Sequence, residues 1–311
     1  MTILKDILYG VSLESISGNT TIAINELQFD SRKVQLNDVF IAVRGTQVDG
    51  HDFIKKAVDQ GAIAVVCEEL PENIINGVTY VITGDSASAL AIMASNFYGN
   101  PSENLKLVGV TGTNGKTTIA TLLYQLFTKA GYASGLLSTV KVMVGDREFP
   151  ATHTTPDPLT INGYLASMNE AGVEYCFMEV SSHAIQQNRV AGIEFRGAVF
   201  TNITHDHLDY HKNMKSYFNS KMYLFKNLLN KNSKIITDEE NKEFKIIKNI
   251  ANKRKIKKIT IGSNSRNIKI LYNKYKQNKQ IVKISVNSKV FLLKTPLVGY
   301  FQIKNLLMAI L

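Results

Sequence analysis

The sequence predicts an α/β protein, in which a small N-terminal α/β domain precedes a larger domain whose mainly parallel sheet is covered by helices. The 311 residues are enough for about two domains of roughly 150 residues each. Short apolar runs alternate with amphipathic helical patterns, and this alternation is typical of parallel sheets. Apolar residues make up 44% of the chain and charged residues 20%, a composition that supports a buried core and excludes global disorder.

The first hundred residues read as the smaller α/β domain. One helix is predicted over 52–61, where Gly61 ends the pattern, and another begins at Ser86 and stops before Gly99 and Pro101. We therefore expect two domains, 1–103 and 104–311. The predicted strands of the first domain are 38–43, 62–67 and 78–83.

The second pattern begins with an apolar strand over 105–110. A glycine-rich turn, 111–118, follows it, and a helix with one apolar stripe is predicted over 119–131. Strands that alternate with helical stretches favour a P-loop ATPase-type, mainly parallel sheet. The further predicted strands are 174–180, 197–203, 233–237 and 257–262.

Several classes of protein are excluded by simple features of the chain. No run approaches about 18 consecutive apolar residues, so we expect no membrane insertion. The N-terminus lacks the basic and apolar regions of a secretory signal. Cys67 and Cys176 lie far apart within apolar runs, which suits a reducing compartment better than a disulfide framework. We expect a cytoplasmic protein.

The net charge of +10 comes from one tract. Residues 226–294 contain 19 Lys and Arg but 4 Asp and Glu, whereas the remainder of the chain is net acidic. Such a tract can form a phosphate-binding face or an ordinary solvated surface. No RNA- or DNA-binding signature accompanies it, and aromatic residues are not interleaved as stacking platforms require. We expect no nucleic-acid partner.

The most informative motif is the glycine-rich turn, Gly109-Val-Thr-Gly-Thr-Asn-Gly-Lys-Thr-Thr118. Glycines between a strand and a helix let backbone N–H groups surround phosphate oxygens at a helix N-terminus. Lys116 is placed to reach the β- and γ-phosphates, and Thr117 to offer its hydroxyl to Mg²⁺. Val110 stands where the general P-loop pattern has glycine. The alternative is a glycine turn with an incidental lysine, but the flanking strand and helix favour a nucleoside triphosphate site.

Three later features extend this site. Glu179 ends an apolar strand, where an open sheet presents ligands, and its carboxylate suits Mg²⁺. Lys221 lies on a predicted helix, and its spacing alone would make it a surface lysine. The segment after the next strand is dense in ligand-type side chains, which favours a metal or phosphate role over a structural one. Its members are His205, Asp206, His207, Asp209 and His211.

Together these motifs resemble the Mur ligases, the ATP-dependent amide-forming enzymes of peptidoglycan synthesis. The resemblance rests on GVTGTNGKTT, EVSSH, TNITHDHLDYH and the lysine of YFNSK, in that order. The segment DSRKVQLNDVFIAVRGTQVDGHDF resembles the UDP-binding domain of the third- and fourth-step ligases. The stretches HTTP and EVSSHAIQQNRV favour the third step, that of the UDP-N-acetylmuramoyl-tripeptide synthetases.

The resemblance implies a set of site residues. The catalytic residues would be Lys116, Glu179, His207 and Lys221, the last carbamylated so that it becomes a carboxylate-like ligand. The metal ligands would be Thr117, Glu179, His207 and Lys221. ATP would contact Gly112, Thr113, Asn114, Gly115, Lys116, Thr117, Thr118 and Asn305. The uridine diphosphate end of the substrate would contact Phe29, Ser31, Thr46, Gln47 and Val48, and its muramoyl-dipeptide end His153, Thr154, Thr155, Ser181, Gln187 and Arg189.

The implied reaction adds an amino acid to UDP-N-acetylmuramoyl-L-alanyl-D-glutamate, with ATP and Mg²⁺. A terminal carboxylate would first form an acyl phosphate, which the incoming amine would then displace. meso-Diaminopimelate and L-lysine are both open as that amino acid. The segments HTTP and EVSSH, with the UDP-type first domain, count against another Mur-type ligase or a folylpolyglutamate synthetase.

Two departures from the family pattern bear on activity. Gln302 stands where asparagine is usual in the segment GYFQIKN. The chain stops at Leu311, so the family's amino-acid-selecting third domain, about 150 residues on the domain-size prior, is expected to be absent. The alternative to a ligase is therefore a non-catalytic module that binds nucleotide or the UDP-muramoyl-peptide.

Overall fold

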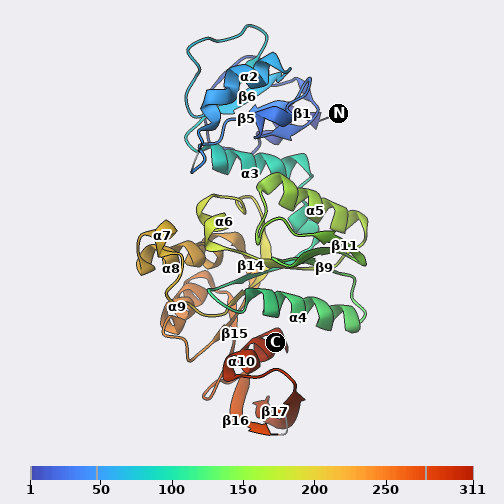
Figure 1. The fold of residues 1–311 in the computed structure, drawn as a ribbon, viewed down its shortest axis with the longest axis vertical. Coiled ribbons are helices and arrows are strands. Elements are labelled where there is room, and N and C mark those ends of the chain that lie inside the picture. The colour runs from blue at the N-terminus through green and yellow to red at the C-terminus, as the bar shows by residue number, and fades with distance from the viewer. Residues whose placement is uncertain (1, 47, 277–278, 311) are drawn as a thin grey trace. The chain divides into compact units, whose positions relative to one another are not determined.

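The computed structural model describes residues 2–46, 48–276 and 279–310. Its chain divides into two compact units (Figure 1). The first comprises Met1–Pro101 with two later segments, Asp157–Ala166 and Gln187–Ile193, and the second comprises the rest. The assignment of 1–103 and 104–311 to separate substrate and ATP domains stays a prediction.

The first unit is built on a five-stranded sheet in the order β2-β7-β6-β5-β4, parallel except for β2. Apolar side chains of α1 and α3 pack on one face of this sheet and those of α2 on the other. The strands are β2 (Leu13–Ser17), β4 (Leu27–Gln28), β5 (Val39–Ile41), β6 (Ala64–Cys67) and β7 (Thr79–Thr83), and β1 (Thr2–Ile3) pairs with β3 (Ala23–Ile24). The helices are α1 (Leu4–Ile7), α2 (Ile54–Asp59) and α3 (Ser86–Phe97), with 3-10 turns at Ser31–Lys33 and Gly50–Phe53.

The start predicted for the helix at Ser86 is confirmed, and its cap explains it. The Asp85 side chain accepts a hydrogen bond from the Ser88 amide at 2.8 Å, which satisfies one of the free N–H groups of the first turn. The helix ends at Phe97, two residues before Gly99, whose φ of 71° lies in the left-handed region.

The second unit contains an eleven-stranded sheet in the order β11-β10-β9-β12-β8-β13-β14-β15-β16-β17-β18. The seven neighbouring strands β9, β12, β8, β13, β14, β15 and β16 run parallel to one another. Antiparallel pairs extend both edges of the sheet, through β10 and β11 on one side and β17 and β18 on the other. The predicted mainly parallel sheet is therefore confirmed for the central strands. The strands are β8 (Lys106–Thr111), β9 (Ser134–Leu137), β10 (Lys141–Val144), β11 (Arg147–Pro150), β12 (Tyr175–Glu179), β13 (Phe195–Phe200), β14 (Leu229–Asp238), β15 (Lys257–Gly262), β16 (Ile268–Lys276), β17 (Lys279–Val286) and β18 (Lys289–Thr295).

Helices cover this sheet, as Figure 1 shows for α4. α4 (Lys116–Lys129) packs against α10 (Tyr300–Ile310), and both contribute apolar side chains to one core cluster with Val110 and Val199 of the sheet. α4 begins three residues earlier than predicted, because Gly115 with a φ of 88° turns the chain directly into it. The other helices of this unit are α6 (Ser182–Gln186), α7 (Leu208–His211), α8 (Met214–Tyr223) and α9 (Phe244–Arg254), with a π-helical turn at Leu224–Leu228. The helix α5 (Pro158–Glu170) begins in the segment that belongs to the first unit.

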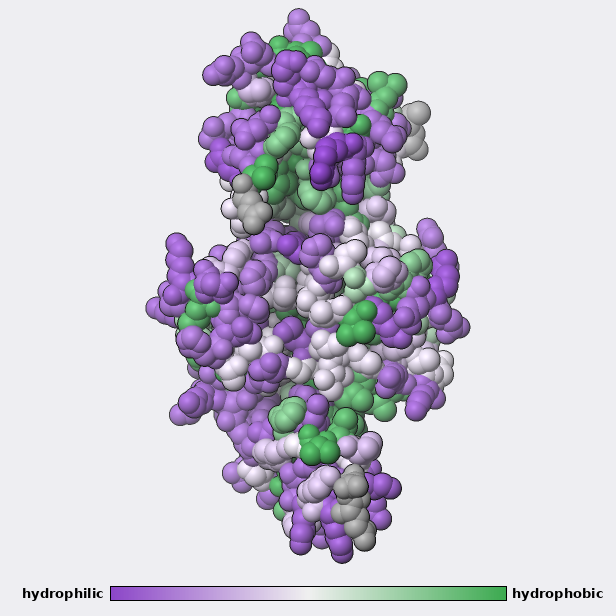
Figure 2. All heavy atoms as spheres, viewed as in Figure 1, coloured by the Kyte–Doolittle hydropathy of each residue, from purple (hydrophilic) through white to green (hydrophobic). Residues whose placement is uncertain are grey.

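The basic tract, 226–294, contains the predicted strands β14 and β15 and the helix α9. It also contains nearly all of the strands that end the sheet, β16 to β18, which the sequence did not predict. Val282 and Ile284 of β17 point into the core, whereas Lys283 between them is exposed. Apolar side chains of β18 and α10 are exposed as well. Figure 2 shows hydrophobic residues among hydrophilic ones on the side of the molecule that faces the viewer. The expectation of no nucleic-acid partner stays a prediction.

Within the described residues, no helix is both long and apolar enough to cross a bilayer. Cys67 and Cys176 are buried free thiols.

Substitution of Gly109 should destabilise the strand that leads into the P-loop. A β-carbon there would lie 2.9 Å from the buried Phe195 ring, and such overpacking costs about 1–3 kcal/mol. We expect Gly109→Ala to lower the free energy of unfolding in urea titrations. The matched control is Gly197→Ala on the neighbouring strand β13, where a β-carbon would make only ordinary contacts at 3.6 Å. Equal stability of the two variants would contradict this packing argument.

Candidate functional site

The P-loop joins β8 to α4 at the carboxyl edge of the parallel sheet. Two of its glycines have backbone conformations that L side chains rarely adopt, with φ 149° at Gly112 and 88° at Gly115. A β-carbon on Gly112 would collide with the Thr201 hydroxyl, and one on Gly115 would lie 2.7 Å from the Asn305 side-chain oxygen. The loop thus needs glycine both for its backbone conformation and for the close approach of its neighbours.

Lys116 closes the loop on itself. Its Nζ donates to the carbonyl oxygens of Gly112 at 3.1 Å and Thr113 at 2.8 Å. Burial lowers the pKa of this ammonium, and the carboxylates of Glu179 and Asp206 oppose that shift. The predicted phosphate lysine is thereby held at the mouth of the loop.

The loop is braced by the segment that follows β13. The Thr201 hydroxyl donates to the Asn114 carbonyl at 2.6 Å, and the Asn202 side-chain oxygen accepts from the Asn114 amide at 3.1 Å. The Thr113 amide in turn donates to the Asn202 carbonyl at 2.9 Å. The sequence predicted ligand chemistry for this stretch but not its bracing role. This role could have been expected from the place of the stretch directly after a predicted strand. That strand, β13, pairs with β8, which leads into the P-loop.

Glu179 is a fully buried carboxylate at the end of β12. It accepts hydrogen bonds from the Thr117 hydroxyl at 3.0 Å, the Thr139 amide at 2.8 Å and the Thr139 hydroxyl at 3.2 Å. All these donors are uncharged. The structure therefore brings the predicted pair Thr117 and Glu179 together, and it adds Thr139, which the sequence analysis missed.

Lys221 is a buried residue of α8, not a surface lysine, with 1% of its surface exposed. Its Nζ donates to the Gly112 carbonyl at 3.0 Å and lies 4.4 Å from the centre of the Tyr217 ring. Burial, and then the positive charge of Lys116, lower the pKa of Lys221 to about 7. Two lysines from distant parts of the chain thus share one P-loop carbonyl.

The histidines gather around α7. His207 is half exposed and has a left-handed φ of 52°, and its Nε2 lies 3.5 Å from Asp206. Its ring lies edge-on to that of His183, with 4.9 Å between the centroids. His211 is buried and shares a 2.9 Å hydrogen bond with the Ser182 hydroxyl, and its Nδ1 has no partner among the described residues.

The described residues contain no group of three or more His, Cys, Asp and Glu side chains arranged to hold a metal ion. The predicted ligand set of Thr117, Glu179, His207 and Lys221 therefore stays a prediction, in which only the contact between Thr117 and Glu179 is formed directly.

The predicted substrate residues of the second unit differ in accessibility. The Thr155 hydroxyl is buried, donates to the Glu179 carbonyl at 2.8 Å and accepts from the Ser181 amide at 3.1 Å. The Ser181 hydroxyl accepts from the Ala184 amide in the first turn of α6 at 3.1 Å. Thr154 accepts from the Thr139 hydroxyl, and His153 is exposed. The Thr155 hydroxyl thus supports Glu179 and Ser181.

The predicted uridine residues lie in the first unit. Ser31 is buried at the start of a 3-10 turn, and Phe29 is exposed. Thr46 and Val48 are exposed in a turn closed by a 3.0 Å hydrogen bond from the Gly45 amide to the Val48 carbonyl, while Gln47 lies outside the described residues. Arg189, also of this unit, donates to the Gln187 side-chain oxygen at 2.9 and 2.6 Å.

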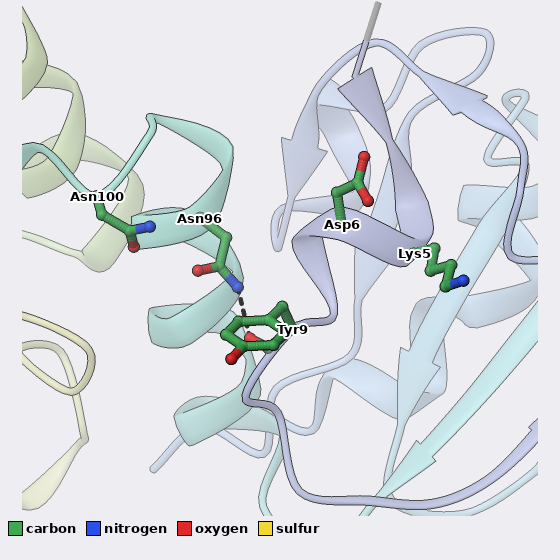
Figure 3. A pocket seen from close by; sticks show the side chains of 5 residues that line it. All are labelled: Lys5, Asp6, Tyr9, Asn96 and Asn100. Atoms are coloured by element: carbon green, nitrogen blue, oxygen red, sulfur yellow. Dashed lines mark hydrogen bonds between the residues drawn. The ribbon is translucent and has the colours of Figure 1, made fainter.

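A pocket of about 300 Å³ also lies in the first unit (Figure 3). Its lining residues are Lys5, Asp6, Tyr9, Asn96 and Asn100, none of which belongs to the predicted sites. The Asn96 amide group is committed to the Ile7 and Tyr9 carbonyls, both at 2.7 Å. This side chain therefore fastens α3 to the end of α1.

Comparison with known families matches both units of the chain. Residues 110–311 match the Mur ligase middle domain, and residues 23–98 match the catalytic domain of the Mur ligase family. The chain belongs to the Mur ligase family.

Curated Mur ligase relatives are similar over most of the chain. A protein named UDP-N-acetylmuramoyl-L-alanyl-D-glutamate--2,6-diaminopimelate ligase from Cytophaga hutchinsonii is 52% identical over 247 residues, covering 79% of this chain and 51% of the relative. A protein of the same name from Bacteroides fragilis is 50% identical over 239 residues, covering 77% and 49%. The chain spans about half the length of these curated relatives.

Solved Mur ligase structures share the fold. A structure titled with the same ligase name has a TM-score of 0.83 at 23% identity, covering 99% of this chain and 62% of that chain. The MurF ligase of Thermotoga maritima, solved with ADP, has a TM-score of 0.60 at 20% identity and covers 92% and 61%.

Acid should destabilise this Mur ligase through His211. Burial, and then the neighbouring His183 charge, lower the pKa of His211 from 6.5 to about 4. Because the unfolded chain takes up this proton first, the free energy of unfolding should fall between about pH 6.5 and pH 4, by up to about 3 kcal/mol from this group. In urea titrations across this range, His211→Asn should show a shallower fall than the wild type. The exposed His205→Asn should keep the wild-type slope, and equal slopes for all three proteins would contradict the prediction.

Proposed function

We propose that this protein is an ATP-dependent ligase that joins the third amino acid to UDP-N-acetylmuramoyl-L-alanyl-D-glutamate in peptidoglycan synthesis. The carrying observation is the braced P-loop, with Lys116 at its mouth, the buried carboxylate of Glu179 beside Thr117, and the buried Lys221. The printed names of relatives about 50% identical support this choice within the family. We propose the cytoplasm as its location, which the buried free thiols suit.

The nucleotide would bind along the P-loop. The loop residues Gly112, Thr113, Asn114, Gly115, Lys116, Thr117 and Thr118 would contact its phosphates at the N-terminus of α4, where the helix dipole favours negative charge. Lys116 would exchange its two loop carbonyls for phosphate oxygens. Asn305, on α10 against Gly115, would contact the nucleotide from the other side.

Magnesium fits the donor set beside the loop. Thr117 and Glu179 offer oxygen ligands of the kind that Mg²⁺ prefers, and a buried carboxylate whose hydrogen-bond donors are uncharged is stabilised by a cation. Bound there, Mg²⁺ would neutralise charge on the transferring phosphoryl group. His207 would join this set as a further ligand.

Lys221 would serve the metal as a carbamate. A buried ammonium beside Lys116 is unfavourable, and the lowered pKa leaves much of the amine neutral near pH 7, the form that attacks CO₂. The new N–C bond releases one proton and leaves a negative carbamate, which replaces like-charge repulsion by attraction to Lys116 and Mg²⁺. We therefore assign the catalytic roles to Lys116, Glu179, His207 and Lys221.

Two sets of residues would hold the UDP substrate, whose carboxylate is the acyl donor, and the incoming amino acid would supply the amine that accepts the acyl group. Phe29, Ser31, Thr46, Gln47 and Val48 would hold the uridine diphosphate. His153, Thr154, Ser181, Gln187 and Arg189 would hold the peptide, positioned in part by Thr155. The substrate carboxylate would take the γ-phosphoryl group as an acyl phosphate, and the incoming amine would displace phosphate. We propose meso-diaminopimelate as the amine, as the relatives' names indicate, with L-lysine as the alternative.

A nucleotide assay tests the P-loop assignment. Lys116→Ala should abolish release of ADP in the presence of both substrates, because no other side chain of the loop carries a positive charge to the phosphates. Binding of the UDP substrate should be unchanged. The matched control is Lys129→Ala at the exposed end of the same helix, which should behave as the wild type. Unchanged ADP release by Lys116→Ala would overturn the nucleotide assignment. A wild type that binds ADP and the UDP substrate but releases no ADP would favour the non-catalytic module.

Carbamylation of Lys221 has a direct spectroscopic test. After incubation with ¹³C-bicarbonate, the wild type should show a carbamate carbon signal in NMR spectra, because its buried amine can react with CO₂. Lys221→Ala should lack this signal, and short carboxylates such as acetate should partly restore its ligation by filling the vacated position. Lys215→Ala, an exposed lysine of the same helix, should keep the signal. Full ligation by Lys221→Ala without bicarbonate would refute the assignment.

A further inference from the structure

One ion-pair cluster beside the P-loop has no role in the reaction described above. Lys304 of α10 lies 2.7 Å from a carboxylate oxygen of Asp238 and 2.7 Å from one of Glu240. Asp238 ends β14 and is almost completely buried, while Lys304 keeps only 20% of its side chain exposed. Ion pairs with this little exposure are weakly screened by salt, unlike most surface pairs.

The cluster is completed by further polar and aromatic contacts. Glu240 also accepts from the Ser263 amide at 3.0 Å and the Ser263 hydroxyl at 2.8 Å, so its carboxylate is fixed to the loop after β15. The Lys304 ammonium lies 4.7 Å from the centre of the Tyr300 ring, and the Tyr300 hydroxyl donates to Glu240 at 3.3 Å. Tyr300 and Lys304, which are four residues apart on α10, therefore both hold this helix to the cluster.

The same short segment reaches the loop that braces the P-loop. Asn241 donates to the Thr201 carbonyl at 3.0 Å, and the Thr201 hydroxyl holds the Asn114 carbonyl. Residues 238–241 thus connect α10 on one side with the P-loop brace on the other. Asp238 also accepts from the Glu240 amide at 2.9 Å, which keeps the segment folded.

Asn305 is the residue next to Lys304, and it is the part of α10 that meets the P-loop. It is buried, and its side-chain oxygen occupies the space beside Gly115 that a β-carbon would need. Its amide nitrogen donates to Gln302 at 3.2 Å, one turn earlier on the helix. A rotation of α10 about its axis, or a shift along it, would move Asn305 away from the loop.

We propose that Lys304 is a positioning residue for nucleotide binding, which acts by holding α10, through Asp238 and Glu240, in the register that keeps Asn305 against the P-loop. This inference rests on the proposed function, because it requires that nucleotide bind at this loop. Lys304 itself does not touch the loop in the contacts of the described chain. Its effect is transmitted through Asn305, and this distinguishes it from a phosphate-binding lysine.

The test measures the dissociation constant of ADP by calorimetry for the purified protein. Lys304→Met keeps the length of the side chain and removes its charge, and it should weaken ADP binding about five- to tenfold, since charge-assisted hydrogen bonds are roughly twice as strong as neutral ones. Lys304→Arg should restore most of the affinity. Lys248→Met, at an exposed lysine of α9, is the matched control and should bind ADP as the wild type does.

Two double variants decide how Lys304 acts. In an Asn305→Ala background, Lys304→Met should cause little further loss, because the residue that it positions is already gone. Likewise Lys304→Met with Asp238→Asn should be no weaker than the worse single variant, as expected for partners in one interaction. Affinity for the UDP substrate should be the same in all variants, and a general loss of stability would lower it too.

The outcomes separate this inference from the proposed function. A wild type that binds no ADP would overturn both. Normal ADP binding by the wild type, with loss in Lys116→Ala but none in Lys304→Met, would overturn the positioning role alone. The same would follow if Lys304→Met weakened binding equally with and without Asn305.

Discussion

The Gly112 carbonyl is the contact on which the arrangement of the site depends. Lys116 from the loop itself and Lys221 from α8 both donate to it, at 3.1 and 3.0 Å. Its orientation requires the left-handed backbone at Gly112, which glycine alone adopts without strain, and the close approach of Thr201 excludes a side chain there. One backbone group thereby sets the positions of two buried lysines.

Burial gives these charged groups their chemical character. Glu179 is buried with uncharged donors, and Lys221 is buried beside a second lysine, so each is costly as it stands and is stabilised by a ligand of the right charge. Under the proposed function, a divalent cation would stabilise the first, and a carbamate would remove the repulsion at the second.

Support for the loop comes from segments distant in sequence. The stretch after β13 braces Asn114 and Thr113, and residues 238–241 fasten both that stretch and α10. The stretch after β13 and residues 238–241 both leave the carboxyl ends of neighbouring parallel strands, which meet at one edge of the sheet. The parallel sheet is thus the reason that these two stretches lie close to the loop after β8.

The sequence by itself determined the fold class, the central strands, the P-loop and the family, because apolar periodicity and glycine spacing are local signals. It also indicated Thr117 and Glu179 as Mg²⁺ ligands, from the glycine-rich turn and from the end of an apolar strand. Only the tertiary structure decided that Lys221 is buried, that Thr155 supports Glu179, and that Thr139, Asn202 and Lys304 surround the site. Burial and hydrogen-bond partners depend on which distant segments meet, and no periodicity within a segment records that. The strands β16 to β18 were missed for a related reason: their many lysines hide the short apolar alternation that packs against the core.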